Sequence, residues 1–312
     1  MNAAANSAAR ARYLERLQRP LALIEQAIAA GREPPPLAEL ARAAHFSPFH
    51  FHRLYRALCG EALGATVARL RMLAALQALR DPRVRVTDVA LGAGYDTAQA
   101  FARAFRQQLG RTPSELRADT AALDAAIARL GAMPVATPQP ALRVEVISVA
   151  PLRLLARHNV GDARDLDRIY TALFASAGEL GLLDTLLDIY GRPAQDARDV
   201  APADYAFDCA LAFSKPLPAS LPAGLSVLEL GGGTYARLRH VGDYDGLDAA
   251  VEALLRDWLP DSGYVLRDTP LFHHYLDDPE QVAIEALRAD VYVPVERDGA
   301  DESAARPPGP SA

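Results

Sequence analysis

The chain has 312 residues, and half of them are apolar, which is enough for two domains with separate cores. It carries 33 basic and 39 acidic residues, which give a formal net charge of −6. Its two cysteines, Cys59 and Cys209, lie in different predicted domains and in apolar surroundings, which is typical of a protein in a reducing compartment. Since no apolar run is long enough to span a bilayer and no leader pattern opens the chain, we expect a cytoplasmic protein with no membrane association.

Charge is unevenly distributed along the chain. Residues 1–120 contain 17 arginines and 10 acidic residues, whereas the remainder contains 16 basic and 29 acidic residues. A clustered positive charge is typical of a surface that meets nucleic-acid phosphates. The sequence therefore predicts a basic front part that binds double-stranded DNA and an acidic rear part that binds something else.

The N-terminal region has one clear helix signal. Residues 1–12 are rich in alanine and lack an apolar face, so we expect them to be disordered. Apolar residues then recur at helical spacing from Tyr13 to Ala29, and Gly31 ends this helix. The run Pro34-Pro35-Pro36 forces an extended segment after it.

Two segments fifty residues apart share one pattern of aromatic and arginine residues: Phe51-His52-Arg53-Leu54-Tyr55-Arg56 and Phe101-Ala102-Arg103-Ala104-Phe105-Arg106. Each follows a short amphipathic stretch, which begins at Leu37 or at Val86. Between the two parts of each copy lies a helix-start signal, Ser47-Pro48 or Asp96-Thr97. The pattern predicts two helix-turn-helix units.

The second helix of each unit is expected to have one buried side and one side that faces DNA. The buried side carries mainly apolar groups: Phe51, Leu54, Tyr55 and Leu58 in the first unit, and Phe101, Ala104, Phe105 and Gln108 in the second. The opposite side carries basic and hydrogen-bonding groups, which can read base edges in a major groove. A single exposed arginine is usually only a solvated charge, but the repeated spacing favours readout.

Residues 37–117 resemble the AraC/XylS-type DNA-binding domain. The resemblance rests on His50-Phe51-His52-Arg53, on Gly94-Tyr95-Asp96, on residues 100–105 and on Gly110-Arg111-Thr112-Pro113. It implies an all-α, homeodomain-like double helix-turn-helix domain over residues 13–118. A linker helix near residues 62–80 would present both recognition helices to successive major grooves, about 34 Å apart.

The same resemblance implies roles for individual residues. The base-reading positions would be Phe49, His52, Arg53, Ala98, Gln99 and Arg103, and the phosphate contacts would be Arg56, Thr97 and Arg106. Because alanine occupies positions 98 and 102, we expect the first unit to contribute more sequence discrimination. RNA polymerase is a candidate partner of such a regulator.

The rest of the chain divides into a linker, a second domain and a tail. Residues 119–141 are expected to be a linker, because a short helical stretch is followed there by Pro134, Pro138 and Pro140. Residues 142–297 would form the second domain, and the proline- and glycine-containing residues 298–312 a disordered tail.

Residues 142–296 read as an internal duplication, with strand, strand, helix, strand, strand in each half. The second strand of each half ends in a similar turn, Arg157-His158-Asn159-Val160-Gly161-Asp162 and Arg239-His240-Val241-Gly242-Asp243, and we place the copies 82 residues apart.

The second half of this region is similar to the GyrI-like, Rob-type effector-binding domain. The residues that carry the similarity are Trp258-Leu259-Pro260-Asp261, Tyr275-Leu276-Asp277-Asp278-Pro279 and residues 287–295. The resemblance implies an α+β duplicated domain with a groove between its halves that binds apolar, often cationic, small molecules. It also implies a strand carboxylate, but here His273 takes that place, which favours a neutral or anionic effector or pH-sensitive binding. Four other carboxylates remain candidates: Glu145, Asp208, Glu229 and Glu296.

We expect a small hydrophobic or aromatic effector, because ring faces bind apolar and cationic groups. The candidate ligand-binding residues, led by Trp258 and Tyr275, are Trp258, Tyr275, Tyr264, Tyr292, His273, Phe207, Tyr190 and Tyr170. Each of them could equally be a core residue.

Two other interpretations of the second domain stay open, a small-molecule hydrolase and a protein-interaction module. The sequence has no recognisable nucleophilic triad, and Gly231-Gly232-Gly233 is more typical of a turn than of a phosphate-binding loop. His50 and His52 fall on different faces of a helix, so we expect no metal and no cofactor. The sequence thus predicts a transcription regulator that is not an enzyme.

Overall fold

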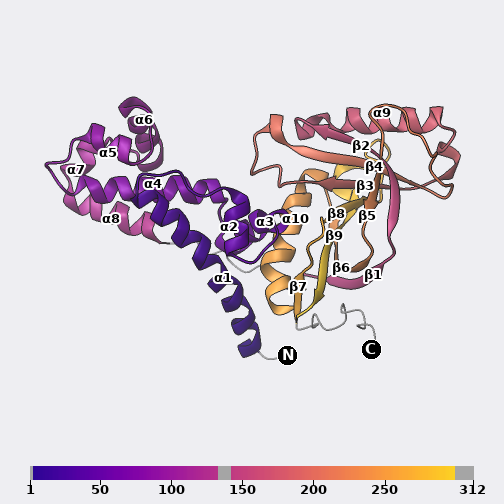
Figure 1. The fold of residues 1–312 in the computed structure, drawn as a ribbon, viewed down its shortest axis with the longest axis horizontal. Coiled ribbons are helices and arrows are strands. Elements are labelled where there is room, and N and C mark those ends of the chain that lie inside the picture. Colours follow the sequence, from indigo (N-terminus) through magenta and orange to yellow (C-terminus); the bar gives the residue numbers. More distant parts are fainter. Residues whose placement is uncertain (1–2, 133–141, 299–312) are drawn as a thin grey trace, which may run out of the picture. The chain divides into compact units, whose positions relative to one another are not determined.

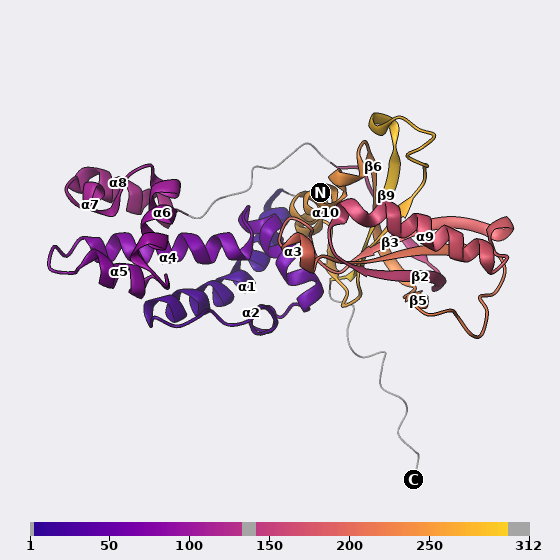
Figure 2. The ribbon, with the colours of Figure 1, turned by 90° about the horizontal axis from the view of Figure 1, so that it is seen from above.

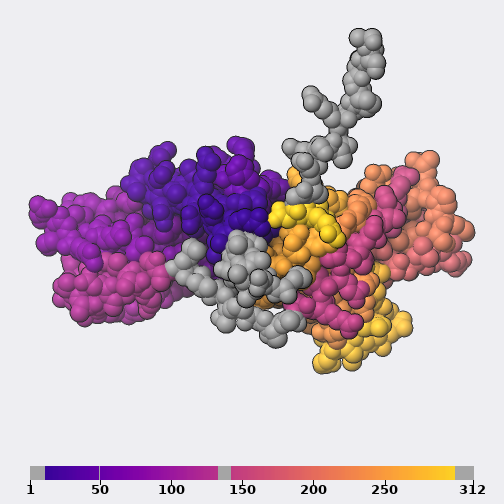
Figure 3. All heavy atoms as spheres, turned by 90° about the horizontal axis from the view of Figure 1, so that it is seen from below, coloured from indigo at the N-terminus to yellow at the C-terminus, as the bar shows by residue number. Residues whose placement is uncertain are grey.

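The computed structural model describes residues 3–132 and 142–298 (Figure 1). These residues form two compact units, one within residues 10–138 and one within residues 139–312. In the space-filling view of Figure 3, the first unit is coloured indigo to magenta and the second magenta to yellow. Each unit has its own hydrophobic core, formed by helices in the first and around an antiparallel sheet in the second.

The first unit is all helical, as the sequence predicts. Its helices are α1 (Ala3–Ala29), α2 (Leu37–Ala43), α3 (Pro48–Cys59), α4 (Leu63–Leu79), α5 (Val86–Gly92), α6 (Ala98–Leu109), α7 (Pro113–Arg117) and α8 (Thr120–Gly131). The pairs α2–α3 and α5–α6 are the two predicted helix-turn-helix units. Helix α4 connects them, close to the predicted bounds of the linker helix.

The two helix-turn-helix units share the same turn. In both, an amide donates to the carbonyl five residues before it, Phe46 to Ala41 at 2.9 Å and Tyr95 to Ala90 at 3.1 Å. This helix ending requires a positive φ at the preceding residue, which is His45 (φ 56°) in the first unit and Gly94 (φ 78°) in the second. The repeated turn confirms that the sequence pattern is a structural duplication.

Helix α1 is longer than predicted and holds the first unit in place. It begins at Ala3 instead of Tyr13, so residues 3–12 are helical and not disordered, because alanine is the strongest helix former. The ring of Tyr13 stacks on Phe46 with centroids 6.0 Å apart. Arg16 places its guanidinium 3.7 Å from the centre of the same ring and donates to the carbonyl of Ala44 at 2.9 Å. Helix α1 therefore covers the end of α2.

Helix α8 belongs to the first unit and not to the linker. Leu123, Ala126 and Leu130 are buried in its core, and Arg69 of α4 donates to the carbonyl of Leu130 at 2.8 Å. The predicted linker from residue 119 therefore begins too early, because the sequence showed the helix but not its packing. The proline-rich residues 133–141 and the predicted tail from residue 299 lie outside the described residues.

The second unit confirms the predicted order of strand, strand, helix, strand, strand in each half. The first half contains β1 (Val144–Val149), β2 (Leu152–Val160), α9 (Leu166–Glu179), β3 (Leu186–Pro193) and β4 (Ala206–Phe213). The second contains β5 (Ser226–Leu230), β6 (Gly233–Val241), α10 (Leu247–Ala253), β8 (Phe272–Tyr275) and β9 (Arg288–Arg297). A π-helical turn (Leu254–Trp258) and the short strand β7 (Tyr264–Leu266) are additions that the sequence did not predict.

The sheet has an internal two-fold pattern. Its strand order is β1-β6-β9-β8-β3-β4-β2-β5, with β7 paired to β9. Exchanging each strand for its counterpart in the other half gives the same order backwards. The axis passes between β3 and β8, where Tyr190 lies opposite His274. Helix α9 packs on β2 and β4, and α10 on their counterparts β6 and β9, so both helices lie on the same face of the sheet (Figure 2).

One detail of the predicted duplication is wrong. The strand register places His158 opposite Asp208 and Arg239 opposite Asp290, so the counterpart of Arg239 is His158 and not Arg157. The first copy has one extra residue before its turn, and a shift of one residue in a strand moves a side chain to the other face. Arg157 accordingly reaches α9, whereas Arg239 lies on the opposite face of the sheet.

Within the described ranges, no single helix is long and apolar enough to cross a membrane. The bent pair His50–Cys59 and Leu63–Leu79 meets that test of length and composition only when the two helices are taken together. In the same ranges, no group of three or more His, Cys, Asp or Glu residues is placed to hold a metal ion.

Candidate functional site

Helix α6 has the two-sided character that DNA recognition requires. Phe101 and Phe105 are fully buried, with ring centroids 5.3 Å apart. Gln99, Arg103 and Arg106 are exposed, and Ala98 is half-buried near the start of the helix. The described residues provide no hydrogen bond or ion pair for Gln99 or Arg103, so both side chains are available to a ligand.

The two ends of α6 are fixed by hydrogen bonds. The hydroxyl of Thr97 accepts from the amide of Ala100 at 3.1 Å, and the amide of Gly110 donates to the carbonyl of Arg106 at 2.8 Å. Gly110 adopts φ 73°, a conformation that glycine reaches without strain. Gln108 was expected on the buried side but is exposed, because the last turn of α6 leaves its polar amide in water.

Helix α3 repeats the buried side of α6. Phe51, Leu54 and Tyr55 are fully buried, as predicted. His52 and Arg53 project from the other side but are only 9% and 3% exposed, and Arg56 is half-buried. The predicted solvent-facing stripe is therefore present on α6, and the base-reading roles of His52 and Arg53 on α3 stay predictions. The side chain of Phe49 lies outside the described part of the structure.

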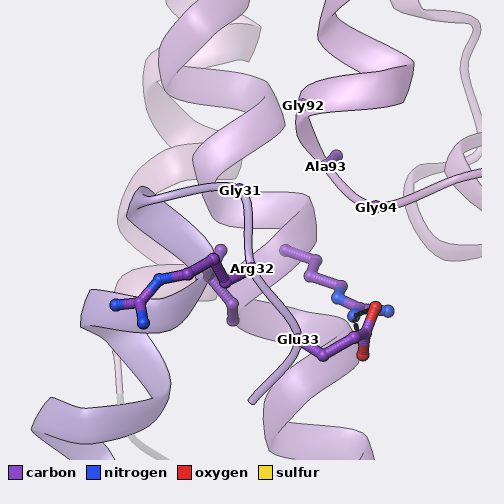
Figure 4. A pocket seen from close by; sticks show the side chains of 8 residues that line it. Gly31, Arg32, Glu33, Gly92, Ala93 and Gly94 are labelled. Atoms are coloured by element: carbon purple, nitrogen blue, oxygen red, sulfur yellow. Dashed lines mark hydrogen bonds and ion pairs between the residues drawn. The ribbon is translucent and has the colours of Figure 1, made fainter.

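A small pocket lies behind the second helix-turn-helix unit, between the end of α1, α4 and the turn after α5 (Figure 4). Arg71 of α4 donates to both carboxylate oxygens of Glu33, at 2.7 and 2.8 Å. Its guanidinium carbon lies 3.1 Å from the place of a Cβ at Gly94. Arg71 thus connects the segment that follows α1 with the turn of the second unit.

The candidate ligand residues of the second unit fall into three places, because alternate residues of a strand point to opposite faces. Tyr170, Phe207, His273 and Tyr275 lie on the face that carries α9 and α10. Tyr190 and Tyr292 lie on the opposite face, in a core with Tyr235 and Phe272. Trp258 and Tyr264 form a separate stacked pair, with centroids 6.0 Å apart. The structure therefore does not bring all eight predicted residues together.

The group on the helix-bearing face forms an aromatic cluster where the two halves meet. Its members, which we call the junction cluster, are Tyr170, Tyr205, Phe207, Tyr244, His273 and Tyr275. The ring of Tyr275 lies 6.0 Å from Tyr170, 4.8 Å from Tyr244 and 6.4 Å from His273. Tyr170, Tyr205 and Phe207 come from the first half, and Tyr244, His273 and Tyr275 from the second.

Burial sets the protonation of the junction cluster. It raises the pKa of Tyr170 and of Tyr275 well above the ordinary tyrosine value, and the neighbouring tyrosines and Cys209 add to the effect. No carboxylate is among the described groups that perturb these two pKa values. The hydroxyl of Tyr170 donates to the carbonyl of Tyr190 at 2.7 Å. Tyr170 and Tyr275 are thus neutral near pH 7, apolar in their rings and polar at their hydroxyls.

Gly191 of β3 makes room for the cluster. A Cβ at this position would lie 2.5 Å from Cζ of Phe207 and 3.0 Å from the Tyr275 hydroxyl. The two rings therefore lie directly over the backbone of β3, and any side chain at position 191 would displace them.

Three of the four carboxylates considered from the sequence have cationic partners away from the cluster. Asp208 accepts from Arg192 at 2.6 Å and interacts with His158 at 2.8 Å. Glu145 pairs with Arg237, and Glu229 lies 3.5 Å from Arg153. Glu296 is exposed near the end of β9. None of these four carboxylates is placed to attract a cation into the junction cluster.

Three residues of this site were not predicted from the sequence: Tyr244, Tyr205 and Gly191. Tyr244 directly follows the turn Gly242-Asp243 that marked the duplication, and this proximity was the signal that could have found it. Tyr205 and Gly191 carry no such signal, since their positions depend on the pairing of β3 with β4.

Two families match the two units. The helix-turn-helix domain family matches residues 40–119, and the family of GyrI-like small molecule binding domains matches residues 143–296. The regulatory protein SoxS of Escherichia coli K12 is 33% identical over 78 residues, which are 25% of this chain and 73% of SoxS. This chain belongs to the AraC-type transcriptional regulators. It carries the GyrI-like small molecule binding domain as its second unit.

The regulator is also similar to the E. coli K12 protein named "Probable transcriptional regulator YgiV". The two are 39% identical over 106 residues, which are 34% of this chain, and the chain spans 66% of the length of YgiV.

Three solved structures share parts of the fold at low identity. The EcmrR–DNA complex is 13% identical and covers 84% of this regulator and 99% of its own chain, with a TM-score of 0.43. The structure of SAV2435 bound to tetraphenylphosphonium is 13% identical and covers 50% of this regulator and 94% of its own chain, with a TM-score of 0.36. A hydrolase encoded by lin2189 from Listeria innocua is 15% identical and covers 50% of this regulator and 93% of its own chain, with a TM-score of 0.39.

Proposed function

We propose that this regulator reads DNA through α3 and α6 and responds to an uncharged, aromatic or hydrophobic effector that binds at the junction cluster. The observation that carries the effector proposal is the ring of Tyr275, which contacts Tyr170 of one half and Tyr244 of the other. A molecule inserted there contacts both halves at once.

The chemistry of the cluster favours a neutral effector. Rings offer apolar contact, and the hydroxyls of tyrosines with raised pKa values remain protonated donors near pH 7. A permanent cation gains some attraction from the ring faces, but it would lose its water, and no carboxylate is among the described groups that shift the pKa values of Tyr170 and Tyr275. We therefore expect neutral aromatic molecules to bind more tightly than apolar cations and more tightly than aromatic acids.

The same chemistry argues for binding and against turnover. Burial raises the pKa of the Cys209 thiol to about 12, so the thiol is protonated near pH 7 and is a poor nucleophile. Tyr170 and Tyr275 stay protonated for the same reason and cannot act as bases. The cluster is thus suited to hold a ligand and lacks an activated group to attack it.

Calorimetry with three probes tests this proposal: a neutral naphthalene, tetraphenylphosphonium and naphthoate. We expect the neutral probe to bind most tightly and Tyr275→Leu to weaken it at least tenfold. Tyr264→Leu, a change of the same kind outside the cluster, should leave the affinity unchanged. Absence of heat with all three probes, together with unchanged Trp258 fluorescence, would contradict an effector site at the cluster.

A further inference from the structure

The segment between β3 and β4 is fastened to the opposite half of the second unit. Arg198 donates to Asp196 at 2.6 Å and to Glu252 of α10 at 2.8 Å. The amide of Ala197 donates to Asp248, also of α10, at 3.0 Å. We call residues 194–205 the strap, and Asp196, Arg198, Asp248 and Glu252 the latch.

The strap ends at the junction cluster. Tyr205, its last residue, is buried, and its ring lies 5.9 Å from Phe207. It also contributes to the raised pKa of Tyr275. Ala197 and Val200 pack against the core beneath α9. One segment thus joins α10, the core under α9 and the cluster between them.

The cross-half contact distinguishes this segment from two similar turns. Arg83 and Arg164 also bond the aspartate two residues before them, through the backbone amide and the guanidinium. Both are 88% exposed, and within the described ranges they form no salt bridge to another element. Arg198 makes the same local turn and in addition reaches α10.

Arg198, Asp196 and Glu252 keep partners when the contact of Arg198 with Glu252 opens. If Arg198 leaves Glu252, it remains bonded to Asp196, which is only 2% exposed. Glu252 remains within 3.7 Å of Arg256. The loss of an ion pair is costly in free energy when it leaves a buried charge unpaired. Neither Arg198 nor Glu252 is left unpaired here, so this cost does not arise.

The latch is connected to the π-helical turn that follows α10. Arg256, in that turn, pairs with Asp257 at 2.7 Å as well as approaching Glu252. Single π-turns inside helices are frequent at functional sites because they shift the register of the following residues. Glu252 is therefore linked through Arg256 to the turn that ends at Trp258.

We propose that the strap closes the junction cluster and that the contact of Arg198 with Glu252 holds it shut. This inference rests on the proposed function, since it describes how an effector gains access to that site. Entry of the effector requires the strap to leave α10, while the Asp196–Arg198 turn stays intact as a rigid tip.

Thiol labelling measures access to the cluster without an effector. Cys209 is fully buried and interacts with Tyr170 of the cluster. We expect a small thiol reagent to modify Cys209 about fivefold faster in Arg198→Ala and in Glu252→Gln than in the unchanged protein, the size expected for a partly exposed ion pair. Arg164→Ala removes the same local turn elsewhere and should not change the rate. Cys59, in the other unit, should keep its rate in every variant.

The possible outcomes separate the two proposals. Equal Cys209 rates in all variants, or equal acceleration by Arg164→Ala, would overturn the closing strap. Faster labelling together with faster binding and release of the naphthalene probe would support both proposals. Faster labelling without binding of any probe would retain the strap as the gate to the cluster and overturn the effector function.

Discussion

At the residue scale, Arg103 shows what a base-reading side chain needs before DNA arrives. It is exposed, and it lies on the side of α6 opposite Phe101 and Phe105, which fix the helix in the core. Arginine can donate two hydrogen bonds to guanine, so an arginine in this position can add sequence preference and not only charge. Arg53 occupies the equivalent position of α3 but is almost completely buried.

This difference leads to a prediction for DNA footprinting. Arg103→Ala should cost about 1–3 kcal/mol of binding free energy and relax the preference within one half of the site. Arg53→Ala should have a similar effect in the other half of the site. Arg106→Ala, at the position expected to contact a phosphate, is the control and should weaken all sequences about equally. Uniform loss in all three variants would mean that none of these arginines reads bases.

The sequence predicted some site residues and could not predict others. Tyr275 and Tyr170 were expected as ligand residues and do meet, because both lie in regular elements whose faces follow from periodicity. Trp258 was expected beside them but stacks on Tyr264, and it lies at the end of a π-helical turn that the sequence did not predict. A deviation of one residue in helical register leaves no trace in a hydrophobic pattern.

At the element scale, α1 and the segment after it contact both helix-turn-helix units. Tyr13 and Arg16 contact the first unit at Phe46. Glu33 holds Arg71, which lies against Gly94 in the turn of the second unit. We infer that this arrangement fixes the spacing between the two recognition helices, because α4 alone joins them on the other side.

A change at Arg71 tests this role. Arg71→Met keeps the apolar stem but removes the ion pair, and Glu33 is 83% exposed, so the free energy of unfolding should fall by less than about 1 kcal/mol. We expect a larger effect on DNA: gel shifts should show less discrimination against sites with one base pair inserted between the halves. Arg83→Met, which removes only a local pair with Asp81, is the control. Unchanged discrimination in Arg71→Met would show that α4 sets the spacing by itself.

The elements themselves were largely predictable, and the exceptions have physical causes. The two duplications were visible because each repeats both its periodicity and its turn residues. The role of α8 in the core was not, since Leu123 and Leu130 have an amphipathic pattern that an isolated helix in a linker could share. The offset of Arg157 from Arg239 was hidden because sequence similarity around the turn masks an inserted residue.

At the scale of the whole molecule, each unit buries one cysteine in its own core. Burial raises the pKa of the Cys59 thiol to about 12 and that of the Cys209 thiol to about 12. In an unfolded chain these thiols ionise above about pH 9. Between pH 9 and 12 the unfolded state therefore binds fewer protons than the native state, so stability must fall as the pH rises.

This linkage predicts separate alkaline limits for the two units. Below pH 9 the buried, protonated thiols make their full contribution to stability. Above pH 9 each thiol should lower the free energy of unfolding by about 1.4 kcal/mol per pH unit. The chain has one tryptophan, Trp258, so its fluorescence during urea unfolding reports the second unit. In Cys209→Ala, the free energy of unfolding of the second unit should decrease less steeply between pH 9 and 10.5. Cys59→Ala should not have this effect, because Cys59 belongs to the other core. If both variants reduce this pH dependence equally, the two units unfold as one. If neither variant reduces it, groups other than the thiols set the alkaline limit.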